Sequence, residues 1–232
     1  MKRRWFVACS VIVAMVFWPA LSVAQTEGDA GTGQTVNVEL IFDVSGSMSQ
    51  RVDTGQTRME IAKRVLGDVI NGIPDRDGIN VGLRIYGFRG DNTEATKENS
   101  CTSSELVVPV AGVDRASLTN EIEALEPIGW SPLTFSLLRA EKDFPAADED
   151  VTNAIVLVTD GLDSCGGDPC DAAGDLASGG AEISISVISM ALTAQEQDTI
   201  NCIVEEGNGL MFGSVSSSEW SDALFPVLEE EE

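Results

Sequence analysis

The stretch VNVELIFDVSGSM, residues 36–48, decides the fold. Every second residue from position 36 to position 42 is apolar, and the residues between them are more mixed, which is the period of a β-strand with one apolar face. The apolar run stops at Asp43, and Gly46 permits the sharp backbone turn that follows. The stretch therefore predicts a strand that ends in a short polar loop.

That loop concentrates oxygen atoms, because Asp43, Ser45 and Ser47 leave the strand at spacing i, i+2, i+4. One carboxylate and two hydroxyls are the kind of ligands that Mg²⁺ takes together with water. A turn closed by local hydrogen bonds from serine and aspartate is the alternative interpretation, and the motif alone leaves both open. We expect the loop to be exposed, so that Asp43→Ala would leave the fold intact.

The two ends of the chain carry their own signals. Residues 1–24 have a basic start, an apolar run and a small-x-small ending at Ala24, which is typical of a cleaved signal peptide. An uncleaved membrane anchor is the alternative, since the apolar run is close to bilayer-spanning length. We interpret the mature protein as exported, periplasmic or secreted, without membrane insertion after cleavage. Residues 25–35 are interpreted as a polar, Gly-rich linker and residues 229–232 as an acidic tail.

Charge and composition exclude several classes of function. The formal net charge of −24 repels nucleic acid and anionic lipid surfaces, so neither is an expected partner. A contribution to solubility is a simpler explanation of such a charge than a cationic partner. The chain has no histidine, which removes the commonest general base, the Ser-His-Asp triad and the usual zinc ligands.

Strand patterns alternate with helix patterns along residues 36–228, which we interpret as one domain. A capping box at Thr57 begins a helix, alternation over residues 79–85 indicates a strand, and residues 154–158 form a continuous apolar run. Pro109 marks residues 105–110 as an edge strand. The order predicts an α/β, doubly wound, Rossmann-like and mostly parallel sheet with one antiparallel edge strand and helices on both faces. A last strand at residues 210–215 and a last helix at residues 218–228 complete it.

Polar residues gather at one edge of this predicted sheet. Asp43 and Asp160 each follow a very apolar strand, and Ser131 opens the helix that lies between them in the sequence. Ligands of such sheets bind at the carboxyl ends of the strands. We therefore expect these three residues to reach one crevice.

In these motifs, residues 36–228 resemble a von Willebrand factor type A domain. The resemblance rests on DVSGS after the first strand, GWSPL at residues 129–133 and VTDG at residues 158–161. More narrowly the chain resembles bacterial exported members, through Tyr86-Gly87, the segment from Cys101 to Pro109, and DSCGGDPC at residues 163–170.

The resemblance implies a metal-ion-dependent adhesion site that binds a divalent cation, Mg²⁺ by expectation, with Ca²⁺ or Mn²⁺ as alternatives. Carried over to this chain, its residues are Asp43, Ser45, Ser47, Ser131 and Asp160. The family's threonine falls at Ser131, and Thr134 is the rival candidate for that position. One position on the cation stays open for an Asp or Glu carboxylate of a protein partner.

The resulting interpretation is an exported, metal-dependent protein-binding module, an adhesion or scaffold protein with no catalytic residues. Metal-assisted hydrolysis by a Mg²⁺-bound water is one alternative, with Asp163 among the few candidate general bases. A structural module with a vestigial metal site is another.

Four of the five cysteines follow the signal peptide, and an even number in an exported chain predicts two disulfides. Cys101 and Cys165 are both expected in loops at the ligand face. Cys170 and Cys202 are expected on neighbouring helices of one sheet face, because the crossovers are right-handed. We hypothesise the pairs Cys101–Cys165 and Cys170–Cys202. A local Cys165–Cys170 bridge is the alternative.

Overall fold

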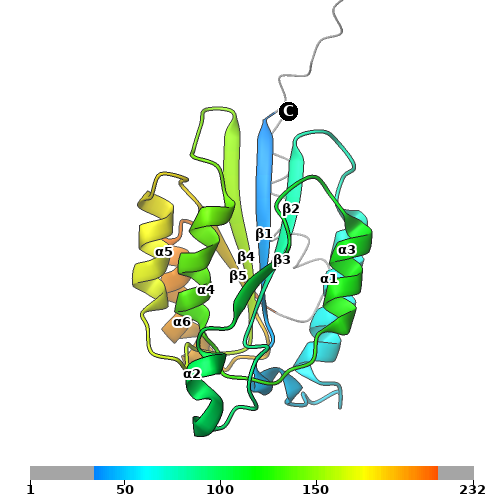
Figure 1. Ribbon diagram of the computed structural model, residues 1–232, viewed down its shortest axis with the longest axis vertical. Coiled ribbons are helices and arrows are strands. Elements are labelled where there is room, and N and C mark those ends of the chain that lie inside the picture. Colours follow the sequence, from blue (N-terminus) through cyan, green and yellow to red (C-terminus); the bar gives the residue numbers. More distant parts are fainter. Residues whose placement is uncertain (1–33, 214–232) are drawn as a thin grey trace, which may run out of the picture. The chain divides into compact units, whose positions relative to one another are not determined.

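The computed structural model describes residues 34–213, whose strands form one six-stranded sheet in the order β3-β2-β1-β4-β5-β6 (Figure 1). The strands are β1 (Thr35–Asp43), β2 (Ile79–Tyr86), β3 (Ser104–Val108), β4 (Val151–Thr159), β5 (Ser184–Ser189) and β6 (Met211–Phe212). The signal peptide, the acidic tail, the expected last helix and the linker up to residue 33 lie outside the described residues. Thr35, assigned to the linker from sequence, already belongs to β1.

All neighbouring strands run parallel except β2 and β3, which are antiparallel. The edge strand β3 ends at Val108, one residue before Pro109, where the missing backbone N–H would interrupt the ladder. The predicted doubly wound sheet with one antiparallel edge strand is therefore confirmed. The last described strand is shorter than expected, since β6 spans only two residues.

Helices cover both faces of the sheet (Figure 1), with α1 and α3 on one face and α4, α5 and α6 on the other. Their bounds are α1 (Arg58–Gly72), α3 (Arg115–Ala124), α4 (Leu133–Ala140), α5 (Pro169–Ser178) and α6 (Ala194–Glu206). The segment between β2 and β3 holds two short helices, η2 (Glu94–Thr96) and α2 (Lys97–Ser100). Two further single turns are η1 (Gly46–Ser49) and η3 (Glu141–Asp143). None of the helices within residues 34–213 has the length and apolarity needed to cross a bilayer.

Local capping chemistry explains where the helices begin. Thr57 accepts the backbone N–H of Glu60 while the Glu60 carboxylate accepts that of Thr57, and Thr193 and Glu196 repeat this capping box before α6. Asp168 accepts two backbone N–H groups of the first turn of α5, whose first residue is Pro169. The start of α1 at the capping box of Thr57 is the one that the sequence predicts.

The central strand β1 is buried on both faces, whereas its pattern predicts one apolar and one mixed face. Glu39, in the middle of β1, is fully buried and accepts a hydrogen bond of 2.8 Å from Arg84 Nε of β2. Arg84 also pairs with Asp143, at the end of η3. A three-residue ionic network therefore lies between the sheet and the connection that follows α4.

Burial is the main reason that the pKa of Glu39 rises from 4.5 to about 8, while the charge of Arg84 lowers it and that of Asp143 raises it. The Glu39 Oε2 atom has no hydrogen-bond partner among the described residues. Both observations indicate that ionised Glu39 is poorly compensated in the folded protein.

Glu39→Gln is expected to flatten the pH dependence of stability. The wild-type folded state keeps a proton up to about pH 8, whereas the unfolded chain releases it near 4.5, so the free energy of unfolding falls as pH rises between these values. When the pH rises from about 5 to about 8, the free energy of unfolding of the variant should increase relative to that of the wild type by roughly 1 kcal/mol or more. Urea unfolding at both pH values, without metal, measures this. Parallel pH profiles of the two proteins would contradict it.

Two disulfides join Cys101 to Cys165 and Cys170 to Cys202, as hypothesised from the topology. The first ties the segment after β2 to the segment after β4. The second ties the first turn of α5 to α6. Disulfides of this kind are typical of proteins that fold in an oxidising compartment.

Candidate metal centre

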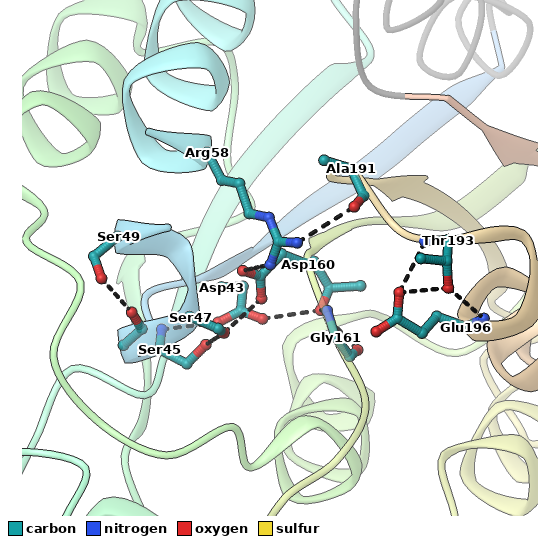
Figure 2. Close-up of polar contacts among 12 residues, drawn as sticks. Asp43, Ser45, Ser47, Ser49, Arg58, Asp160, Gly161, Ala191, Thr193 and Glu196 are labelled. Atoms are coloured by element: carbon teal, nitrogen blue, oxygen red, sulfur yellow. Dashed lines mark hydrogen bonds and ion pairs between the residues drawn. The ribbon is translucent and has the colours of Figure 1, made fainter. Parts of the chain in front are cut away.

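The segments that follow β1 and β4 meet at the carboxyl ends of these strands and surround a cavity of about 330 Å³. Its lining includes Ser45, Ser47, Ser131 and Asp160. Of the three residues that the sequence predicts at one crevice, Ser131 and Asp160 line this cavity. Asp43 lies between the serine loop and Asp160 (Figure 2), but it is not among the residues that line the cavity.

Asp43 is fully buried, and this corrects the expectation of an exposed loop. Its Oδ1 accepts the backbone N–H of Ser45 at 2.8 Å, and its Oδ2 accepts the Tyr86 hydroxyl at 2.8 Å and the Thr159 hydroxyl at 2.9 Å. The carboxylate thus joins the ends of β1, β2 and β4. Tyr86 and Thr159 belong to the site through Asp43, although neither was assigned a role in it from sequence.

These surroundings shift the pKa values of Asp43 and Tyr86. Burial, and then the charge of Asp160, raise the pKa of Asp43 from 3.8 to about 6, against hydrogen bonds from Ser45 and Tyr86 that lower it. Burial, and then the charge of Asp43, hold the pKa of Tyr86 well above its ordinary value of 10. The Tyr86 hydroxyl therefore remains a hydrogen-bond donor to Asp43 at neutral pH.

Three oxygen-bearing side chains are linked in a row beside this pair (Figure 2). The Ser45 and Ser47 hydroxyls lie 2.9 Å apart, and the Ser47 hydroxyl donates to Asp160 Oδ1 at 2.7 Å. Because the Ser47 hydroxyl donates to Asp160, the Ser45 hydroxyl is the donor in the contact between the two serines, and one lone pair of the Ser47 oxygen remains available to a cation.

Ser131 and Thr134 are the two candidates for the third hydroxyl ligand. Both hydroxyls are buried without a partner that meets normal hydrogen-bond geometry. Ser131 lines the cavity, and its hydroxyl is close enough to Tyr86 to affect that residue's titration. Thr134 is not among the lining residues. A Cβ atom built on Gly167 would lie 2.6 Å from the Thr134 Cβ, so Gly167 packs directly over that threonine. The geometry favours Ser131 as the hydroxyl that faces the cavity.

The loops around the cavity approach one another so closely that two of them need glycine. Gly87 has a φ of +75°, and a Cβ there would lie 2.6 Å from the Trp130 carbonyl oxygen. A Cβ on Gly129 would lie 2.3 Å from the carbonyl oxygen of Arg89. The Tyr86-Gly87 and GWSPL motifs therefore have a steric reason to contain glycine.

Asp163 has a structural task in the adjoining loop. Its Oδ2 accepts the backbone N–H of Thr134 at 2.8 Å, and its Oδ1 accepts those of Cys165 and Gly166, also at 2.8 Å. These bonds order the segment that covers Thr134. They also leave this carboxylate poorly placed to take a proton from a water in the cavity.

The residues around the cavity fit a hard divalent cation. Within residues 34–213, no three aspartate, glutamate or cysteine side chains gather as a metal-binding group, so a cation here must rely on hydroxyls. Ser45, Ser47 and Ser131 supply hydroxyls, Asp160 supplies a carboxylate, and the buried charge of Asp43 lies below them. An oxygen-rich set with few carboxylates suits Mg²⁺ or Mn²⁺ in partly hydrated form. The unpartnered Ser131 hydroxyl is the atom that such a cation would satisfy.

Comparison with known sequences finds uncharacterised relatives. The chain is 28% identical over 203 residues to protein YwmD of Bacillus subtilis, covering 88% of this chain and 89% of YwmD. It is 27% identical over 201 residues to YwmC of the same organism, covering 87% of this chain and 86% of YwmC. No protein-family model matches the chain.

Solved structures with a similar fold are more informative. A von Willebrand factor type A protein from Catenulispora acidiphila aligns with a TM-score of 0.58 at 18% identity, over 82% of this chain and 41% of that one. Manganese-loaded TRAP of Plasmodium vivax aligns with a TM-score of 0.59 at 16% identity, over 85% and 74% of the two chains. A mussel byssus protein with a zinc-occupied metal-ion-dependent adhesion site aligns with a TM-score of 0.53 at 16% identity, over 85% of this chain. The chain spans about half the length of that mussel protein.

Proposed function

Starting from a chain with the von Willebrand factor type A fold, we propose an exported module that binds a divalent cation and uses it to capture an acidic side chain of a protein partner. The observation that carries the proposal is the set of hydroxyls and one carboxylate around a single cavity, among them the buried, unpartnered hydroxyl of Ser131. Two structures of the same fold support it, one with a zinc-occupied adhesion site and one loaded with manganese.

Each residue of the site has a distinct part in this proposal. Ser45, Ser47 and Ser131 present hydroxyl oxygens to the cavity. Asp160 accepts a hydrogen bond from the Ser47 hydroxyl and thereby orients it. Asp43 fixes the loop from below through the backbone N–H of Ser45. A bound Mg²⁺ would supply a Lewis-acidic anchor for the partner's carboxylate, and the surrounding loops would supply selectivity.

Binding is favoured over hydrolysis by the state of the candidate bases. Histidine is absent from the chain, and Asp163 already accepts three backbone N–H groups. Asp43 accepts three donors in a buried position. A vestigial site is disfavoured because the Ser131 hydroxyl, which is buried at the cavity, has no hydrogen-bond partner of normal geometry among the described residues.

Export is part of the proposal and is supported by the two disulfides, which are typical of oxidising compartments. The signal-peptide interpretation of residues 1–24 points the same way. We further propose Mg²⁺ as the resident cation, with Ca²⁺ or Mn²⁺ as the other candidates.

The test is retention of envelope proteins on the immobilised domain. Proteins should be retained in Mg²⁺ and released by a chelator, and an immobilised Asp160→Ala domain should not retain them. Titration calorimetry with Mg²⁺ alone checks the cation directly. Retention that survives both the chelator and the Asp160 replacement would refute a metal-dependent mode of binding.

Replacement of the two rival hydroxyls should separate their roles. Ser131→Ala is expected to weaken Mg²⁺ binding by at least the roughly tenfold loss seen when groups around a metal site are removed, whereas Thr134→Ala should change it little. Ser131→Thr should retain or tighten binding, because the added methyl restricts χ1. Calorimetric dissociation constants of the three variants measure this. A larger loss in Thr134→Ala than in Ser131→Ala would assign the ligand to Thr134.

A further inference from the structure

Arg58, the first residue of α1, places a cation inside the candidate metal centre. Its Nη1 lies 2.8 Å from Asp160 Oδ2, and its Nη2 donates to the backbone carbonyl of Ala191 at 3.3 Å (Figure 2). The side chain of Arg58 is 15% exposed, that of Asp160 is fully buried, and both residues line the cavity. No part was assigned to Arg58 from sequence.

The position of Arg58 does not serve the helix that carries it. The capping box of Thr57 and Glu60 and a 3.0 Å hydrogen bond from Arg58 N to the Gln50 carbonyl hold its backbone. A cation in the first turn opposes the helix dipole, which favours acidic residues there. The charge of Arg58 therefore slightly destabilises α1, and the guanidinium is instead paired with the carboxylate of Asp160.

Asp160 has both carboxylate oxygens engaged. Ser47 donates to Oδ1 and Arg58 donates to Oδ2. Asp43, at the end of β1, lies beside the end of β4 that Asp160 follows, and its carboxylate accepts the hydroxyl of Thr159, the residue before Asp160. Arg58 is the one cation that the structure pairs with either carboxylate within residues 34–213, and it balances part of their charge. A divalent cation at the serine hydroxyls would meet this guanidinium at short range, where like charges repel strongly.

We propose that Arg58 is a resident cation of the site, which holds Asp160 while no divalent cation is bound and is displaced when one enters. This inference rests on the proposed function and deepens it. Arg58 stabilises the metal-free protein and competes with the metal for Asp160, so it lowers metal affinity and sets the concentration at which the site becomes loaded. Occupancy of the metal site then follows the concentration of divalent cation in the compartment to which the protein is exported.

The displaced guanidinium has another carboxylate within the same cavity. Glu196 lines the cavity from the start of α6, opposite the α1 end that carries Arg58 (Figure 2). The charge of Arg58 already contributes to lowering the pKa of Glu196, after the larger effect of hydrogen bonds from Thr193. Glu196 is therefore the acceptor that we assign to Arg58 in the metal-bound protein.

The test compares Arg58→Gln with the wild type in two measurements. Without metal, the variant should unfold at a lower temperature, since Asp160 loses its counter-charge. In Mg²⁺ titration calorimetry, it should bind about tenfold more tightly, the factor that corresponds to about 1.4 kcal/mol. Arg58→Lys keeps the charge but not the planar guanidinium, so its unfolding temperature and its Mg²⁺ affinity should lie between those of the wild type and Arg58→Gln. Arg51→Gln is the matched control, because Arg51 is exposed, bonds to the Gly55 carbonyl and does not line the cavity.

The outcomes separate this inference from the proposed function. Weaker or unchanged Mg²⁺ binding by Arg58→Gln, with normal binding by the wild type, overturns the inference and leaves the metal site in place. If neither protein binds Mg²⁺, both the inference and the proposed function fail. Binding by the variant alone supports a site held closed by Arg58. Glu196→Gln should weaken binding more in the wild type than in Arg58→Gln, and equal effects would refute Glu196 as the acceptor.

Discussion

Asp43→Ala is expected to abolish Mg²⁺ binding and also to lower the free energy of unfolding by about 2–4 kcal/mol. The replacement leaves the Tyr86 hydroxyl, the Thr159 hydroxyl and the Ser45 backbone N–H without an acceptor in a fully buried position. Each unsatisfied buried donor costs about 1–3 kcal/mol, and relief of the buried charge offsets part of the sum. Calorimetry measures the binding, and urea unfolding of the metal-free protein measures the stability.

Two further variants separate the two effects of Asp43. Asp43→Asn keeps one oxygen acceptor and most of the volume, so it should lose Mg²⁺ binding at a smaller cost in stability. Asp114→Ala removes the exposed cap of α3, whose carboxylate accepts the Ser117 N–H, and should cost about 1 kcal/mol with no effect on binding. Unchanged Mg²⁺ affinity in Asp43→Ala would show that the carboxylate below the loop is not needed for a cation.

Local patterns predicted the elements and the loops that carry the site. Alternation, capping boxes and proline positions are properties of neighbouring residues, so β1, α1, α5 and α6 could be located from them. The right-handed crossover rule then placed Cys170 and Cys202 on helices of one face, where the disulfide joins them. These inferences needed no knowledge of side-chain contacts.

The burial of Asp43 and the ion pair of Arg58 with Asp160 could not be predicted in this way. Asp43 and Thr159 are separated by 116 residues, and Arg58 and Asp160 by 102. Such contacts depend on strand register and on the angle at which α1 meets the sheet, neither of which a local pattern contains. The one available signal was an arginine in a helix position where the dipole disfavours it.

The buried network of Glu39, Arg84 and Asp143 was missed for a related reason. A glutamate that alternates with apolar residues indicates a solvated face, and only the parallel pairing of β1 with both β2 and β4 puts that face inside the protein. The sequence therefore predicts where the oxygens of the site gather better than it predicts how their charges are balanced.

Removal of the two disulfides, one at a time, should separate stability from binding. By loop-closure entropy, the bridge between Cys101 and Cys165, 64 residues apart, and that between Cys170 and Cys202, 32 residues apart, should each contribute about 4 kcal/mol to stability, the first slightly more. Double replacement by alanine at either pair should lower the free energy of unfolding by about this amount, less where the denatured state keeps structure. Urea unfolding of the two double variants measures these costs.

Of the two double replacements, only that of Cys101 and Cys165 should also weaken Mg²⁺ binding, because this disulfide holds segments that border the cavity. The segment after Cys101 leads into β3. Ser100, the residue before Cys101, accepts the backbone N–H of Trp130 with its hydroxyl at 2.7 Å, and Trp130 is the residue before Ser131. On the other side of the bridge, Ser164 accepts the backbone N–H of Ser131 at 2.8 Å. The Cys101–Cys165 bond therefore clamps the two segments that orient the unpartnered hydroxyl, whereas the Cys170–Cys202 bond joins two helices away from the cavity. Calorimetry at a temperature where both variants are folded decides the matter, and equal losses of affinity in both would show that the first bridge stabilises the fold without ordering the site.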